Sequence, residues 1–234
     1  LVLNTKNVIG LSATPFANDV NKILLENTIG KINYKCKNYE LVPIVKSIIY
    51  DSYLDENAVK RFFMNRDYIK QIAFYNSVIA DSDAYINVIT DIAKEVFEDK
   101  NRRLLVLVST VKQLNKVVDQ LNFEGFRAKP FYSKEREINK EFDKLLVATY
   151  KMAGTGFDYK ELSDLVLACP LKGRTSLIQT IGRILRQSEN KPRPVVYDLI
   201  DSRFNEAFTS AIKSKTGILL KEFGNKCEFE SIYR

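Results

Sequence analysis

Short apolar runs alternate with amphipathic segments through the second half of the chain, and this alternation constrains the fold more than any other feature. Each run is apolar at consecutive positions, so both faces of the strand that it predicts would be buried. Such strands, separated by helices, are typical of a parallel sheet covered by helices on both sides. The predicted strands lie at Leu104–Val108, 126–132, 144–150, 163–170 and 193–201, and the predicted helices at 111–125, 134–143 and 176–187.

The beginning of the chain carries shorter signals. A buried strand is predicted at Val8–Leu11, and the helical rhythm that follows it is closed by Gly30, because glycine favours the end of a helix. Residues 39–51 predict an extended segment. Proline lacks a backbone N–H, so Pro43 suggests that this segment lies at the edge of the sheet.

A largely helical stretch separates these signals from the alternating half. Residues from about Glu56 to Phe97 have helical periodicity, with a break and a new helix start at Asp81–Asp83. Residues 204–224 predict one more helix at the end. The predicted fold class is therefore α/β, a parallel sheet with helices on both faces, plus an extra helical segment.

Charge and composition narrow the possible partners. The chain has 234 residues, of which 45% are hydrophobic, enough for one large domain or two small ones with a sizeable core. Lys and Arg number 36 against 29 Asp and Glu, a net charge of +7. This excess fits a polyanionic partner, and the alternative is a merely solvated basic surface.

Several kinds of site find no support in the sequence. The three cysteines, Cys36, Cys169 and Cys227, are far apart, so neither a zinc site nor a disulfide framework is indicated. The chain has no histidine, which removes the commonest general base and metal ligand. No apolar run approaches membrane-spanning length. We expect no metal site of its own, no membrane partner and an intracellular, reducing location in the cytoplasm or nucleus. A viral or phage protein is included among the options.

The stretch "IQTIGRILRQ", residues 178–187, carries the first candidate site. On a helix, Gln179, Arg183 and Arg186 would share one face, and the isoleucines would occupy the opposite, buried face. Two guanidiniums beside an amide suit phosphate oxygens. The alternative is a surface helix whose arginines pair with acidic neighbours. Gly182 lies between the two faces, and a glycine costs a helix about 1 kcal/mol relative to alanine. The close approach of a partner is one interaction that could compensate for this cost.

Three further stretches follow predicted strands. In "GTGFD", Gly156 lets the backbone approach a ligand and Asp158 can accept from ribose hydroxyls, although a plain turn is the alternative. Ser109 and Thr110 stand at a predicted helix start, where they can bind phosphate or simply cap the helix. In "LSATP", Ser12 and Thr14 follow a predicted buried strand. Their hydroxyls could relay a change from one site to another, and the alternative is that they simply terminate the strand.

The order of these stretches is more specific than any one of them. "SATP", an apolar strand ending in "ST", then "TGFD", then "QTIGRILR" resemble motifs III, IV, V and VI of superfamily 2 helicases. The resemblance covers Val8–Pro15 and about residues 103–201. Glutamine at position 179 is unlike DEAD-box proteins. The motifs look most like DExH-type helicases: the UvsW and XPB group, those of large DNA viruses, and the motor parts of type I and III restriction enzymes. Residues 29–34, "IGKINY", resemble the link between the two lobes of the UvsW and XPB group.

The resemblance implies a RecA-like second motor lobe and a role for each matching residue. Gln179, Arg183 and Arg186 would face ATP held on a preceding lobe, with Arg186 as the arginine finger and Arg183 also near the γ-phosphate. Gly156 and Asp158 would lie at the nucleotide-facing edge of the cleft.

The same resemblance implies a nucleic-acid track. Ser109, Thr110 and Thr149 would contact the phosphate backbone of DNA or RNA. Ser12 and Thr14 would couple hydrolysis to movement of the lobes.

The departures from the family pattern are as informative. The sequence contains no G-x-x-x-x-G-K-[ST] and no DExH motif, so ATP and Mg²⁺ would be bound mainly by a first RecA-like lobe. The chain begins at Leu1 and opens almost directly on "SATP", so we expect a fragment. The expected division is 1–16 for the end of the first lobe, 17–31 for the inter-lobe link and 32–234 for the second lobe, with a helical segment at about 56–98. Alone, such a chain should not hydrolyse ATP usefully.

Three functions fit these observations. The first is the C-terminal lobe of an ATP-dependent helicase or translocase. The second is a non-catalytic nucleic-acid-binding or scaffold module that keeps the lobe-two fold, and the third is the motor part of a restriction enzyme. The joint presence of Gln179, Arg183, Arg186, Gly156 and Asp158 favours the first, because a module without ATP has no physical need for that set.

Overall fold

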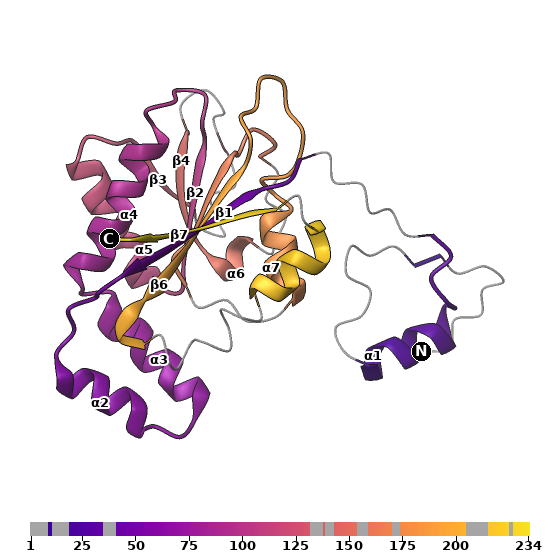
Figure 1. Ribbon diagram of the computed structural model, residues 1–234, viewed down its shortest axis with the longest axis horizontal. Coiled ribbons are helices and arrows are strands. Elements are labelled where there is room, and N and C mark those ends of the chain that lie inside the picture. The colour runs from indigo at the N-terminus through magenta and orange to yellow at the C-terminus, as the bar shows by residue number, and fades with distance from the viewer. Residues whose placement is uncertain are drawn as a thin grey trace.

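Seven parallel strands form a single sheet in the computed structural model of the chain (Figure 1). The structure describes residues 9–10, 19–34, 41–131, 138, 143–153, 159–169, 174–204, 215–224 and 227–234. The strand order is β3-β4-β2-β5-β6-β1-β7, and every neighbouring pair is parallel. The parallel α/β sheet predicted from the sequence is therefore confirmed.

The elements follow the predicted alternation closely. The strands are β1 (Ile44–Tyr50), β2 (Leu104–Val108), β3 (Ala128–Phe131), β4 (Leu145–Thr149), β5 (Asp164–Leu167), β6 (Val195–Asp201) and β7 (Glu228–Tyr233). The helices are α1 (Asp19–Thr28), α2 (Glu56–Met64), α3 (Tyr68–Ile79), α4 (Asp83–Val96), α5 (Val111–Phe123), α6 (Tyr150–Ala153), α7 (Arg174–Ile181) and the 3₁₀ turn η1 (Ser202–Phe204). Residues 215–223 are also helical. Among the described residues, no helix has both the length and the apolar character that crossing a membrane requires.

The central strand β2 shows why consecutive apolar residues predict this sheet. All five of its residues are at most 1% exposed. Side chains along a strand alternate between the two faces, so Leu104 and Val106 join one core while Leu105 and Leu107 join the other. A strand with only one apolar face would leave one of the two cores incomplete.

Different helices cover the two faces (Figure 1). Helices α3, α4 and α5 contribute to the first core, and α5 does so through Leu114, Val117, Val118 and Leu121, whose helical spacing places them on one face. Helix α7 and helix 215–223 contribute to the second core. Gly125, which stops α5, has a φ of 88°, and Gly30, which follows α1, has a φ of 114°. Both are left-handed conformations that glycine adopts without steric cost.

The prediction that the segment at 39–51 lies at the edge of the sheet is wrong. Strand β1 is not an edge strand, because β7 pairs with it on the side away from β6. Pro43 precedes the first strand residue, Ile44, so its missing N–H removes no bond from the ladder. The edge strand on this side is β7, and its sequence lacks the consecutive apolar residues that predict the central strands.

Two other predicted elements, the strand at Val8–Leu11 and the charged helix at 134–143, lie mostly outside the described residues. Ile9 and Gly10, the described part of the strand predicted at Val8–Leu11, are not in a strand. The charged helix predicted at 134–143 lies outside the described residues except for Ile138 and Asp143, neither of which is helical. The break predicted at Asp81–Asp83 is confirmed, because Ser82 caps the N-terminus of α4 and its Oγ accepts a bond from the Tyr85 N–H.

Candidate functional site

The predicted helix at 176–187 ends earlier than its sequence pattern suggests. Helix α7 stops at Ile181. Its last α-helical bond joins the Gly182 N–H to the Ile178 oxygen at 2.8 Å, and the next two N–H groups reach back only three residues. A Cβ at position 182 would lie 3.0 Å from the Ile178 oxygen, so glycine permits this tightening. Arg183 and Arg186 therefore stand on a turn beyond the helix, which corrects the prediction that they share a helical face with Gln179.

The apolar side of the same segment is buried as predicted. Residues Ile178, Ile181, Ile184 and Leu185 are 5%, 0%, 0% and 7% exposed and belong to the second core. Gln179 and Arg186 are exposed, and Arg183 is partly buried. The three polar side chains thus stand on a backbone that is anchored by a close-packed apolar wall, although a turn rather than a helix sets the direction of the two arginines.

The residues predicted to contact nucleic acid meet at the carboxyl edge of the sheet. Val108 of β2 pairs with Thr149 of β4, so Ser109 and Thr110 follow directly beside Thr149. All three are partly buried. In open parallel sheets, ligands bind beyond the carboxyl ends of the strands, and the placement of these three residues agrees with that rule.

Thr110 caps helix α5, as the simpler interpretation of this residue predicted. The Thr110 Oγ1 accepts from the Gln113 N–H at 3.2 Å, and the Gln113 Oε1 accepts from the N–H groups of Ser109 and Thr110, each at 2.9 Å. Gln113 is 1% exposed. Since an internal side chain occupies both amides, a phosphate contact here would come from hydroxyl groups rather than from the amides of Ser109 and Thr110.

Four of the predicted site residues lie outside the described part of the chain. These are Gly156 and Asp158, predicted at the nucleotide edge, and Ser12 and Thr14, predicted to couple the lobes. Their roles stay predictions.

A helical hairpin, α2 and α3, lies at the same carboxyl edge, below β6 and β1 in Figure 1. An aromatic cluster fixes its base: the ring centroid of Phe204 lies 4.8 Å from that of Phe62 and 5.0 Å from that of Tyr75. Phe62 and Phe204 are both 0% exposed. The other end of α3 contacts α5, because the Gln113 side-chain amide donates to the Asn76 oxygen at 3.4 Å. The C-terminal end of α3 therefore lies against the start of α5, which follows Ser109 and Thr110.

The tip of this hairpin presents apolar and basic side chains together. Met64 and Ile69 are 80% and 78% exposed, and Phe63 is 44% exposed. Three exposed basic residues, Arg61, Arg66 and Lys70, accompany them. The stretch "RFFMNRDYIK", residues 61–70, already interleaves these residue types. That signal was available in the sequence, but helical periodicity alone did not single it out.

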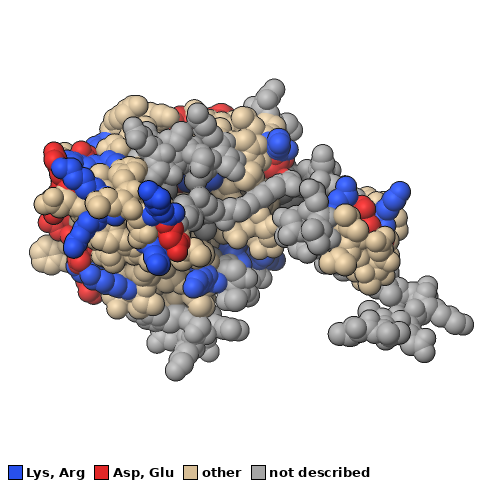
Figure 2. Space-filling view, turned by 90° about the horizontal axis from the view of Figure 1, so that it is seen from below, with Lys and Arg blue, Asp and Glu red and all other residues tan. Residues whose placement is uncertain are grey.

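A compact ion cluster joins the hairpin to α5. Asp81 contacts Lys112 at 2.6 Å and also Lys116. The hydrogen bonds from these two lysines lower the pKa of Asp81 to about 2. Figure 2 looks toward this edge from below and shows Lys and Arg side chains spread over the surface, with Asp and Glu side chains among them.

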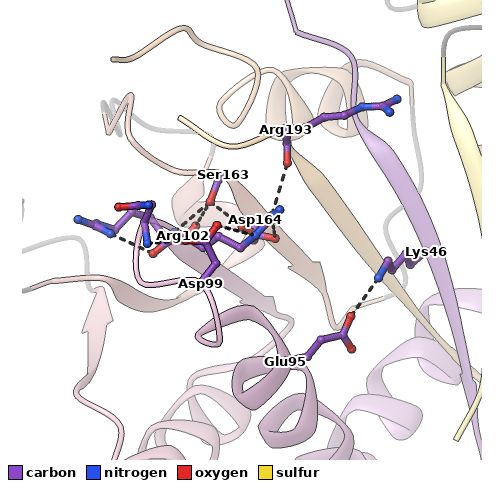
Figure 3. Close-up of polar contacts among 9 residues, drawn as sticks. Lys46, Glu95, Asp99, Arg102, Ser163, Asp164 and Arg193 are labelled. Atoms are coloured by element: carbon purple, nitrogen blue, oxygen red, sulfur yellow. Dashed lines mark hydrogen bonds and ion pairs between the residues drawn. The ribbon is translucent and has the colours of Figure 1, made fainter. Parts of the chain in front are cut away.

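The opposite, amino edge of the sheet is internally paired (Figure 3). Asp164, 0% exposed at the start of β5, accepts from the Arg102 Nη1 at 2.9 and 3.1 Å and from the Ser163 Oγ at 2.5 Å. Burial raises the pKa of Asp164 to about 6, against the opposing effects of Ser163 and Arg102. The Arg102 Nη1 also reaches the Arg193 oxygen at 3.4 Å. This network ties together the chain segments that enter β2, β5 and β6.

Neither a metal centre nor a disulfide is found in the part of the chain that the structure describes. No group of three Asp, Glu, Cys or His side chains gathers there to hold a metal ion. Cys169 and Cys227 are free thiols, and both are buried.

The sequence of the central part of this fold matches a known family of domains. Residues 86–188, from α4 to the turn after α7, match the helicase conserved C-terminal domain. These residues carry a helicase C-terminal domain of the superfamily 2 type.

Its relatives include two viral proteins. "Putative helicase 22" of Sulfolobus islandicus filamentous virus is 26% identical over 220 residues, which cover 86% of this chain and 39% of that protein. "Putative ATP-dependent RNA helicase L396" of Acanthamoeba polyphaga mimivirus is 27% identical over 232 residues, which cover 94% of this chain and 43% of that protein. The chain therefore spans less than half the length of both relatives.

A solved structure shows the same fold. The crystal structure of T4 UvsW superposes with a TM-score of 0.57 at 19% sequence identity, over 81% of this chain and 41% of UvsW. The sheet and its covering helices therefore share the fold of the matching part of UvsW.

Proposed function

We propose that the protein is an ATP-driven nucleic-acid helicase or translocase in which this chain supplies the second motor lobe. The observation that carries the proposal is the arrangement at the end of α7 and in the turn after it. Gln179 and Arg186 are exposed and Arg183 is partly buried, on a backbone anchored by a buried apolar wall, within residues that match the helicase C-terminal domain. A rigid support for an exposed guanidinium, here that of Arg186, is what stabilisation of transferring phosphoryl groups requires.

On the nucleotide side, Arg186 acts as the arginine finger and Arg183 lies near the γ-phosphate, with Gln179 beside them. A first RecA-like lobe holds ATP and Mg²⁺. In the second lobe, Gly156 and Asp158 line the nucleotide-facing edge of the cleft. ATP supplies the free energy for movement, and the residues of this chain supply cationic charge where negative charge develops.

The segment that precedes the sheet supports this two-lobe arrangement. In this proposal, residues 1–16 end the first lobe, 17–31 link the lobes and 32–234 form the second. Helix α1 stands clear of the sheet (Figure 1), and its Ile23 and Leu24 are each 59% exposed. Such apolar side chains would be covered by contact with a first lobe. Ser12 and Thr14 then couple hydrolysis to lobe movement.

On the nucleic-acid side, the carboxyl edge forms the track. Hydroxyls of Ser109, Thr110 and Thr149 contact backbone phosphates. The hairpin tip adds Arg66 and Lys70 with neighbouring apolar side chains, a combination that suits a strand of DNA or RNA because cations meet phosphates and apolar groups meet bases. The helical segment at 56–98 thereby gains a function that periodicity alone did not indicate.

The decisive experiment measures nucleic-acid-stimulated ATP hydrolysis by the full-length protein. Arg186→Ala should lower kcat by roughly 10³-fold or more, the usual contribution of an arginine finger, while ATP affinity stays within a few-fold. Arg127→Ala, at an exposed arginine beside β3, serves as the matched control and should leave hydrolysis unchanged. Full turnover by the Arg186→Ala protein would instead favour a non-catalytic binding module.

A second measurement tests the division of labour between lobes. The chain 1–234 alone should hydrolyse ATP no faster than a buffer blank, because the phosphate loop and the DExH carboxylates are not in its sequence. Hydrolysis by this chain at the rate of the full-length protein would contradict the proposal that the first lobe holds the nucleotide.

A further inference from the structure

Lys191 makes two backbone contacts that connect the segments bearing the proposed nucleotide residues. It lies in the loop between the turn after α7 and β6. Its Nζ donates to the Arg186 oxygen at 2.6 Å and to the Lys160 oxygen at 2.8 Å. Lys160 follows Asp158 by two positions in the sequence. One ammonium group therefore joins the main chain at the proposed finger to the main chain just after the proposed nucleotide-edge residues.

The local backbone directs this lysine inward. Asn190 has a φ of 56°, a left-handed conformation that asparagine tolerates better than most residues. The Lys191 N–H donates to the Ser188 oxygen at 3.3 Å, so residues 188–191 form a tight turn. The turn points the chain back toward Arg186, and the Lys191 side chain is partly buried rather than extended into solvent.

A long cationic side chain usually keeps its charged end in water, so the partial burial of Lys191 has a desolvation cost. Burial lowers the pKa of Lys191 to about 8; the Arg186 guanidinium acts in the same direction, and the carboxylates of Glu161 and Asp164 oppose it. An ammonium that had no local role would remain hydrated. The two carbonyl contacts are the interactions that offset this desolvation.

The carbonyl of Arg186 needs such a support because the helix has already ended. Beyond Ile181 the backbone no longer has the regular bonds of α7, and Ile184 and Leu185 are the last residues that the apolar wall anchors. A fixed peptide plane at Arg186 sets the direction in which its side chain leaves the backbone. The Lys191 ammonium also repels the Arg186 guanidinium, which disfavours its folding back onto the loop.

We infer that Lys191 is a positioning residue, which holds Arg186 for hydrolysis by tying its carbonyl to that of Lys160. The inference rests on the proposed role of Arg186. It predicts that loss of the ammonium slows the chemical step and leaves nucleotide binding alone, because Lys191 acts through the direction of the guanidinium.

The experiment compares variants of the full-length protein in nucleic-acid-stimulated ATP hydrolysis. Lys191→Met keeps the chain length and removes the donors; kcat should fall by about tenfold to a hundredfold, the usual effect of misplacing a catalytic group by about 1 Å, with the KM for ATP within threefold. Lys191→Arg, which keeps cationic donors, should recover most of the loss. Lys144→Met is the matched control, because Lys144 also donates to a carbonyl, that of Lys100 at 3.2 Å, at the same edge of the sheet.

The double variant Arg186→Ala/Lys191→Met separates the two proposals. If Lys191 acts through Arg186, the double variant should be no slower than Arg186→Ala alone. A folded Lys191→Met protein with wild-type kcat, or a double variant whose losses multiply, would overturn the positioning role while the finger role stands. Wild-type turnover by Arg186→Ala would remove both. Should Lys191→Met melt below the assay temperature, Lys191→Gln takes its place under the same kcat criterion.

Discussion

The two edges of the sheet use the same residue types in opposite ways. At the amino edge, Asp164 is fully buried and bonded to Arg102 and Ser163. At the carboxyl edge, Asp81 shares two lysines at the surface, and the tip of the α2–α3 hairpin presents Arg66 and Lys70 to solvent. Charges that are desolvated need each other and belong to the fold, whereas exposed charges contribute little to stability and are available to a ligand.

The largest expected effect on stability comes from removing Arg102 at the amino edge. Arg102→Met leaves the Asp164 carboxylate buried without its cation and should lower the free energy of unfolding by about 3–5 kcal/mol in denaturant titrations. Lys112→Met breaks an ion pair at the carboxyl edge with a 2.6 Å contact and should change stability far less. Equal losses from the two variants would show that the edges do not differ in the proposed way.

The pH dependence of stability should have opposite signs at the two edges. The pKa of Asp164 is raised to about 6 in the fold, so its contribution to stability is present below about pH 4 and is lost as the pH rises through 6. The loss amounts to about 2–3 kcal/mol. Asp164→Asn should remove that slope in urea titrations between pH 4 and 7.

At the carboxyl edge, the pKa of Asp81 is lowered to about 2. Its contribution is therefore present above about pH 4 and disappears as the pH falls toward 2. Asp81→Asn should flatten stability in that acid range and leave the slope between pH 4 and 7 intact. If Asp81→Asn altered the higher range instead, the assignment of the two slopes would be wrong.

Nucleic-acid affinity should respond only to the carboxyl edge. In the full-length protein, Arg61→Gln/Arg66→Gln/Lys70→Gln should weaken binding about tenfold or more at moderate salt and reduce the slope of log affinity against log salt by about 3. Lys100→Gln/Lys144→Gln at the amino edge is the control and should alter neither quantity much. Equal weakening by the two sets would indicate non-specific charge rather than a defined track.

The smallest expected effect concerns Thr110, which caps α5 and is also proposed to contact phosphate. Thr110→Ala removes the hydroxyl that accepts from the Gln113 N–H and should cost about 1 kcal/mol of unfolding free energy. Thr110→Ser keeps the hydroxyl and should cost much less in the same denaturant titration. If Thr110→Ser weakens nucleic-acid binding as much as Thr110→Ala does, the hydroxyl is not the group that contacts phosphate.

Much of the fold could be predicted because its signals are local. Consecutive apolar residues at Leu104–Val108 place the central strand correctly, and the heptad-like spacing of α5 gives its buried face. The end of α7 was not predicted, since the sequence after Ile181 keeps a helical pattern. Its termination depends on the close backbone approach that Gly182 permits, since a Cβ there would lie 3.0 Å from the Ile178 oxygen, and on the bonds that form when Ile184 is packed against the sheet.

The candidate site divides in the same manner. The identities of Gln179, Arg183 and Arg186 and the buried apolar side of their segment follow from the sequence pattern. The contact between Lys191 and Arg186 does not, because it depends on a left-handed turn at Asn190 and on the position of Lys160, which lies 31 residues away from Lys191. No periodicity records a bond from a side chain to a distant backbone oxygen.

The sequence by itself determined the class of fold, the core positions of its central strands and the residues that match helicase motifs, because apolar periodicity and motif order are properties of neighbouring residues. The pairing of β7 with β1, the bond between Asp164 and Arg102 and the contact between the end of α3 and the start of α5 follow only from the tertiary structure. Each of these depends on which distant segments the closed sheet brings together, since burial, pairing and pKa are set by neighbours in space rather than along the chain.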